Sequence, residues 1–164
     1  MNFSSIKEYF YKLTNRCYLL VLLPLLTFVY LYFQMQSKKI MPMVQQEESV
    51  VFMLIGFAIA CAINLTTVHL LSKKRLALYA KETGLGNKLD RYAEIITLRM
   101  GGGSASSLLM AVGLLLTGHE FFSLLFMLIL IWILFQWPSS KKACKELSLK
   151  GDEYEMVLYK KEKL

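Results

Sequence analysis

Apolar residues gather in four long runs along the chain, and polar residues fill the segments between them. The runs cover about residues 17–35, 49–71, 98–117 and 121–137. At a rise of ~1.5 Å per helical residue, each run is roughly long enough to cross a hydrocarbon layer ~30 Å thick. The pattern predicts an all-α membrane protein in which four transmembrane helices form an up-down bundle.

The second run has no stop signal where it reaches the membrane boundary. Good helix formers continue to Ala80, and the segment 83–87 then supplies a glycine cap, a turn and an Asn N-cap. A further helix from Lys88 leads directly into the third run. We therefore predict that spans two and three extend as a cytoplasmic helical hairpin over about residues 72–97. The alternative is two unrelated helices joined by a flexible loop.

The two ends of the chain carry shorter patterns. Apolar residues on one face of segment 3–13, with capping-box spacing from Ser5 to Glu8, predict a short interfacial helix on the inner leaflet. In the C-terminal tail, 139–164, apolar residues alternate on both sides of a turn at 150–153. Alternation of this kind is typical of two paired strands, so we expect a small β-hairpin there.

The distribution of positive charge predicts the orientation. Of the 19 Lys and Arg residues, 17 lie in the N-terminal segment, in the loop between the second and third runs, and in the tail. The positive-inside rule assigns that side to the cytoplasm, so both termini are expected to face inward. We expect an integral protein of an inner (cytoplasmic) or plasma membrane.

The composition agrees with this assignment. Hydrophobic residues make up 55% of the chain and charged residues 19%, with a mean hydropathy of +0.44. The net charge of +7 also invites a nucleic-acid interpretation. Orientation and attraction to anionic inner-leaflet lipid explain the charge sufficiently, so we predict membrane lipids as partners and no nucleic acid.

Small residues recur every fourth position in the third run. Gly103, Ser107 and Ala111 fall on one helical face, which is the pattern that lets membrane helices approach closely. We predict that these three residues form a helix-packing face. The alternative is a hinge at 101–103, because glycine weakens a helix by ~1 kcal/mol relative to alanine.

The most polar intramembrane cluster lies near the inner end of the second run and comprises Asn64, Thr67 and His69. In a functional interpretation Asn64 is a ligand or interhelical contact, and His69 is a proton relay or metal ligand. The structural interpretation is that Asn and Thr bond across helices and that a lone boundary His lacks further metal ligands. Arg99 and Glu120 are expected at opposite boundaries of span three, where snorkelling suffices.

Three cysteines cannot all pair, and no disulfide is expected. Cys144 follows two lysines, so it is either an ordinary free thiol or a site of acylation or redox chemistry with a stabilised thiolate.

No catalytic, cofactor or metal motif occurs in the sequence, and we predict none of these sites. The leading hypothesis is a non-catalytic accessory, assembly or interaction subunit of a membrane complex, with a membrane or cytoplasmic protein partner or a homo-oligomer. The alternative is an oligomeric small-solute channel or transporter. A membrane-embedded lipid-modifying enzyme is the third hypothesis.

Overall fold

The computed structural model describes residues 5–44 and 46–159, which form six helices and no strand. The helices are α1 (Ile6–Gln36), α2 (Glu47–Tyr79), α3 (Leu85–Thr117), α4 (Phe121–Phe135), α5 (Ser140–Glu146) and α6 (Gly151–Leu158).

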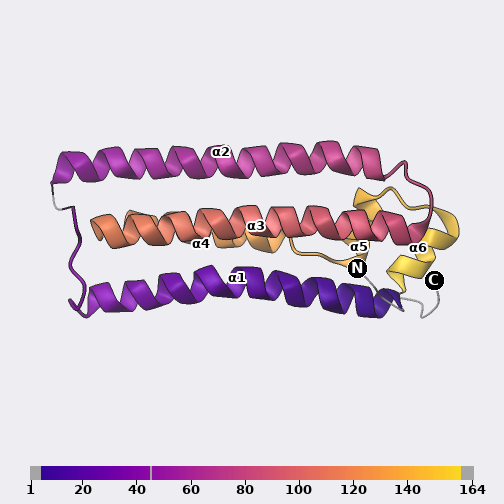
Figure 1. The fold of residues 1–164 in the computed structure, drawn as a ribbon, viewed down its shortest axis with the longest axis horizontal. Helices are drawn as coiled ribbons and strands as arrows, with labels where there is room; N and C mark the ends of the chain where they lie inside the picture. The colour runs from indigo at the N-terminus through magenta and orange to yellow at the C-terminus, as the bar shows by residue number, and fades with distance from the viewer. Residues whose placement is uncertain (1–4, 45, 160–164) are drawn as a thin grey trace.

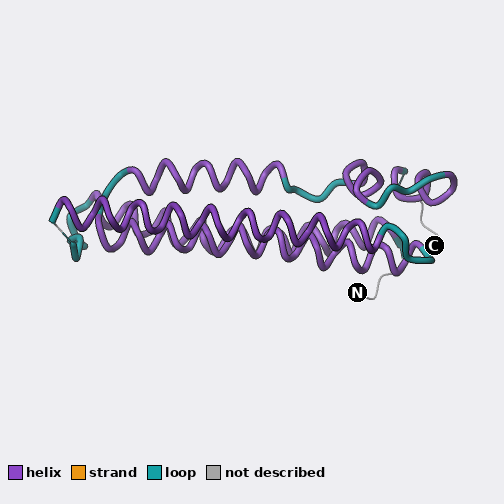
Figure 2. The backbone as a smooth tube through the Cα atoms, turned by 90° about the horizontal axis from the view of Figure 1, so that it is seen from above, coloured by secondary structure: helices purple, strands orange, loops and turns teal. Residues whose placement is uncertain are grey.

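Helix α3 is the central element of the structure. It contacts α1 on one side and α2 on the other, and α4 returns along it (Figure 1). Viewed from above, α1, α2 and α3 form one layer, and α4 to α6 form a second (Figure 2). Helices α1 and α3 run in the same direction, while α2 runs opposite to them. One face of α3 therefore lies between α1 and α2, on the side opposite α4, and is not covered by another of the described helices.

Three of these helices, α1, α2 and α3, are long and apolar enough to cross a membrane. Helix α4 has 15 residues and qualifies only together with α5, from which it is bent by 78°. The bend follows Pro138, which cannot continue a helix. Lys142 of α5 caps the end of α4, because its ammonium group donates a hydrogen bond of 2.7 Å to the carbonyl of Phe135.

Helix α1 is longer than expected. Ser5 caps it by accepting a hydrogen bond from the Glu8 amide at 3.2 Å, and the helix then continues to Gln36 with Pro24 inside it. The prediction of a separate interfacial helix over 3–13 is therefore wrong for residues 5–13, and residues 3 and 4 lie outside the described part. The apolar face of this segment is buried against protein instead of lipid.

Helices α2 and α3 are continuous through the predicted membrane boundary, and the turn between them comes earlier in the chain than expected, at residues 80–84. Helix α3 begins at Leu85, three residues before Lys88, with Gly84 as its N-cap. Gly84 has φ +90°, a conformation that favours glycine. The amide of Asn87 does not cap the helix and donates instead to the carbonyl of Thr83 at 3.4 Å.

The described part of the tail forms α5 and α6, joined by residues 147–150, and contains no strand, so the predicted β-hairpin is wrong. Ser139 caps α5 by accepting from the amide of Lys142, and α6 starts at Gly151, which has φ +57°. The apolar residues that suggested alternating strands are used differently. Leu147, Leu149 and Val157 all turn inward and join the hydrophobic core.

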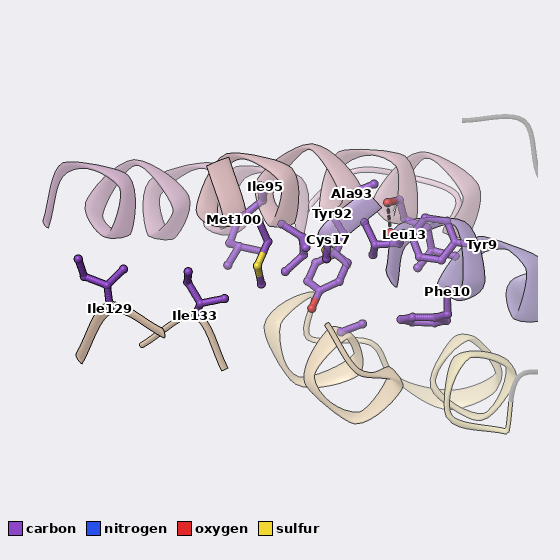
Figure 3. Close-up of a cluster of buried hydrophobic side chains, with 14 of the residues drawn as sticks. Tyr9, Phe10, Leu13, Cys17, Tyr92, Ala93, Ile95, Met100, Ile129 and Ile133 are labelled. Atoms are coloured by element: carbon purple, nitrogen blue, oxygen red, sulfur yellow. Dashed lines mark hydrogen bonds between the residues drawn. The ribbon is translucent and has the colours of Figure 1, made fainter. Parts of the chain in front are cut away.

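Residues 6–16 and 85–98 pack with α5 and α6 into a dense region. We call this region, together with the adjoining residues 72–79 of α2, the head; within 72–79 only Ser72 and Leu76 are buried. Figure 3 shows its centre, where Tyr9, Leu13 and Tyr92 are fully buried. The hydroxyl of Tyr9 donates a hydrogen bond of 2.7 Å to the carbonyl of Leu89, and Lys88 forms an ion pair of 2.7 Å with Glu153 of α6. These contacts join α1, α3 and the tail.

The membrane-length parts of the helices are packed much less. In the most apolar 18-residue stretch, 17% of α1 and 11% of α2 is buried, against 56% of α3. Helices α1 and α2 thus each lie against α3 and leave their outer faces open.

Candidate functional site

Asn64 joins α2 to α3 within the predicted membrane layer. Its side-chain amide donates to the carbonyl of Gly102 at 3.0 Å and to the hydroxyl of Ser106 at 2.9 Å. Both acceptors belong to α3, so one amide satisfies two oxygens across the helix pair. Both N–H groups of the side-chain amide are used in these bonds, which link the two helices. We call this pair of hydrogen bonds the Asn64 clamp.

The other two members of the predicted polar cluster do not meet Asn64. Thr67 and His69 are exposed on α2, and Val68 between them is buried against Gly102. At ~100° per helical residue, His69 lies ~140° around the helix from Asn64, and Thr67 lies ~60° from Asn64 on the exposed side. Among the described residues, no group of three or more His, Cys, Asp or Glu is arranged to hold a metal ion.

The predicted packing face of α3 is turned toward other helices. A Cβ atom on Gly103 would lie 2.6 Å from Ile133 Cγ1 of α4, and Ser107 and Ala111 are buried. The sequence reasoning missed two glycines with the same property. A Cβ atom on Gly102 would lie 2.6 Å from Val68 of α2, and one on Gly113 would lie 2.2 Å from the ring of Phe122 of α4.

Arg99 does not snorkel at a membrane boundary, so that prediction is wrong. Its side chain is 5% exposed and binds both carboxylate oxygens of Glu146, at 2.7 and 3.0 Å. Glu146 belongs to α5, whose fold the sequence analysis did not predict. Tyr92 lies beside this pair, and in Figure 3 its hydroxyl points toward the tail. Burial raises the pKa of Tyr92, so its hydroxyl is neutral at physiological pH.

The environment of Cys144 favours an ordinary free thiol over a reactive one. It is buried in α5, where its sulfur lies 3.7 Å from the carbonyl of Tyr154, and burial raises the pKa of its thiol. A raised pKa reduces the thiolate population that acylation and oxidation require. Burial outweighs the neighbouring lysines that suggested the opposite. Cys17 and Cys61 are also buried and free.

A groove of about 1240 Å³ lies on the surface between α1, α2 and α3. Its floor is the α3 face opposite Gly103, because Gly101 is two residues and ~200° away on the helix. Arg16 of α1 lines one wall, and Val68 and Arg75 of α2 line the other.

The polarity of the groove changes along its length. Close to the α2–α3 turn it is lined by charged residues, and there Arg91 pairs with Glu82 at 3.7 Å and with Glu94 at 3.3 Å. Toward the predicted membrane layer it is lined by Leu98, Gly101 and the Asn64 clamp. The groove is therefore amphipathic, with a charged end and an apolar end.

Comparison with family models, with curated proteins and with solved structures gave no match for this chain.

Proposed function

We propose that the chain is an integral protein of an inner (cytoplasmic) or plasma membrane that acts without catalysis, as an accessory, assembly or interaction subunit of a membrane complex. In this proposal α1 to α4 form an up-down membrane bundle, and the α2–α3 turn and both termini lie in the cytoplasm. The charge distribution supports the orientation. Figure 1 adds that the α2–α3 turn and the tail lie at the same end of the molecule as the start of α1.

The observation that carries the proposal is the contrast between the head and the spans. The head is closely packed, while α1 and α2 expose large apolar side chains along their outer faces, such as Tyr30 and Phe33 on α1 and Phe52 and Ile63 on α2. In a membrane these faces are covered by lipid or by other helices. Leu78, in the head beyond the predicted span, is also 65% exposed, which extends the open face of α2 out of the membrane.

The polar residues of the spans support this interpretation over the solute channel. A pathway within one chain requires polar side chains that line a shared space. The groove includes Asn64, but Thr67 faces outward, and Ser104 and Ser107 are buried in helix contacts away from it.

Site-specific photocrosslinking in native membranes tests the proposal. A photoreactive amino acid replaces Leu78 or Phe52, which are exposed, or Met110, which is fully buried and serves as the control. Single positions are preferable to deletion of the α2–α3 turn, because residues 76–95 include the core residues Leu89 and Tyr92.

We expect a protein adduct of one defined mass at Leu78 or Phe52 and none at Met110. Adducts to lipid alone at both exposed positions would overturn the proposal. Solute flux in vesicles containing the purified chain, above that of empty vesicles, would instead favour the channel.

A further inference from the structure

We propose that the groove on α3 binds one anionic phospholipid, with the headgroup phosphate between Arg16 and Arg75 and an acyl chain lying over Gly101. This inference is separate from the protein partner proposed above. It requires only that α1, α2 and α3 cross the membrane.

Arg16 and Arg75 lie at the same depth on opposite walls of the groove. Tyr9 of α1 contacts Leu89 of α3, so in this parallel pair Arg16 is level with about residue 96. Asn64 of α2 contacts Gly102 and Ser106, so in this antiparallel pair Arg75 is level with about residue 93. Two arginines thus face one space close to where spans one and two reach the cytoplasmic membrane surface.

These two arginines are available to bind an anion. Both are exposed, and within the described part of the chain neither forms an ion pair or a side-chain hydrogen bond. Arg91, by contrast, is already neutralised by Glu82 and Glu94. The favourable position for a phosphate is therefore between Arg16 and Arg75.

The membrane end of the groove suits an acyl chain. A Cβ atom placed on Gly101 meets no atom within 4 Å, so the helix surface there borders open space. Leu98 and Val68 supply apolar contacts beside it. A phospholipid bound here keeps its acyl chain in an apolar environment, as in the bilayer, while its headgroup reaches the arginines. A soluble anion has no chain to fill this end of the groove.

The match between groove and ligand identifies a phospholipid by chemistry. Arginine guanidinium groups bind phosphate oxygens in bidentate geometry. Basic pockets between membrane helices on the cytoplasmic side favour anionic headgroups. A soluble phosphate compound would contact only the charged end of the groove. An apolar helix would contact only its apolar end.

Native mass spectrometry of the full chain in mild detergent tests the site. The probe is phosphatidylglycerol, with phosphatidylcholine of the same chain length as the neutral reference. We expect the wild type to retain one phosphatidylglycerol and to prefer it over phosphatidylcholine. The double variant Arg16→Gln, Arg75→Gln is expected to lower that retention about tenfold or more, because two charge-assisted contacts are lost.

The chain offers matched controls for both halves of the site. Lys74→Gln removes an exposed charge from α2 next to Arg75, but Lys74 does not line the groove. Gly101→Leu fills the apolar end, whereas Gly56→Leu places the same side chain on an open position of α2 outside it. Retention should fall with Gly101→Leu and stay unchanged in both controls. Circular dichroism should show equal helix content in all variants.

Equal retention in the groove variants and their controls would overturn the proposal. Competition by glycerol phosphate as effective as that by phosphatidylglycerol would identify a soluble-anion site and also overturn it. The chain could instead form a dimer without lipid that Gly101→Leu dissociates. That result would show that a second copy occupies the groove, and it would also overturn the proposal.

Discussion

The guanidinium group of Arg99 holds the carboxylate of Glu146 with two hydrogen bonds, of 2.7 and 3.0 Å, across 47 residues of chain. Arg99 belongs to α3 and Glu146 to α5, so the pair fixes the tail against the central helix. Both side chains are largely buried, at 5% and 19% exposure. Water therefore screens the pair less than it screens a surface salt bridge.

Loss of one partner should destabilise the protein. Glu146→Gln leaves the Arg99 charge buried and without its carboxylate, and we expect the free energy of unfolding to fall by about 2–4 kcal/mol. Chemical denaturation in mixed micelles measures this change. The exposed pair of Arg91 and Glu94 supplies the control, because Glu94→Gln should cost less than about 1 kcal/mol. Equal losses would contradict the structural role of the buried pair.

A double variant separates charge pairing from simple loss of contacts. Arg99→Met combined with Glu146→Met leaves no unpaired buried charge, so it should be more stable than either single variant. A double variant whose loss equals the sum of the single losses would show that the two residues act independently.

Glycines of α3 should differ sharply in their tolerance of alanine. Gly113→Ala forces a Cβ atom to within 2.2 Å of the Phe122 ring, and we expect a loss of about 1–3 kcal/mol in the free energy of unfolding. Gly101→Ala meets no atom within 4 Å and should be neutral or stabilising, since alanine favours helix. Thermal unfolding of the two variants in the same detergent measures the difference. Similar midpoints would refute close packing of α3 against α4.

The Asn64 clamp should contribute to the pairing of α2 with α3. Asn64→Leu removes two interhelical hydrogen bonds, and the expected loss is about 1–2 kcal/mol, as found for such bonds within membranes. Thr67→Leu is the matched control, because Thr67 lies three residues later and is exposed. Unfolding by denaturing detergent compares the two. An equal loss in the free energy of unfolding for Thr67→Leu would show that the Asn64 hydrogen bonds do not stabilise the pairing of α2 with α3.

Cysteine labelling should report orientation only at exposed positions. The buried thiol of Cys144 has a raised pKa, so it should react slowly with a maleimide at pH 8 even after permeabilisation, and quickly after unfolding. In a variant without native cysteines, Tyr154→Cys should react only in permeabilised cells and Glu120→Cys already in intact cells. The reverse pattern would invert the proposed orientation.

The long helices could be predicted from the sequence because each one combines an apolar run with good helix formers. Helices α2 and α3 follow that pattern through the predicted membrane boundary to the turn at Gly84. The N-terminal segment was harder to interpret. An apolar face over residues 6–13 is compatible with lipid or with protein, and only the tertiary contact of Tyr9 with Leu89 decides between them.

The tail shows why short patterns mislead. Apolar residues at Leu147, Leu149 and Val157 fit an alternating strand as well as short helices with an irregular connection. The head selects the helices, because they place these residues in its core and Glu146 beside Arg99. That pairing joins distant parts of the chain and has no local signal in the sequence.

The candidate site was only partly accessible to sequence reasoning. Asn64 was singled out as polar in an apolar run, but its bonds to Gly102 and Ser106 depend on how α2 meets α3. The groove depends on a further property, the placement of α1 and α2 on either side of α3. Only that arrangement brings Gly101 of α3 and Arg75 of α2 into the lining of the same groove.

The 15 residues of α4 have a consequence for the surrounding bilayer. This helix rises about 22 Å, whereas a typical hydrocarbon layer is about 30 Å thick. The bilayer beside a short apolar segment thins, or flanking polar side chains snorkel to the surface, and each adjustment costs energy for each ångström of mismatch. The opposite side of the molecule, formed by the 33 residues of α2, imposes no such compression. In the proposed membrane arrangement the bilayer is therefore thinned on the α4 side only, and we expect the protein to favour thin membranes and neighbours that share the same mismatch.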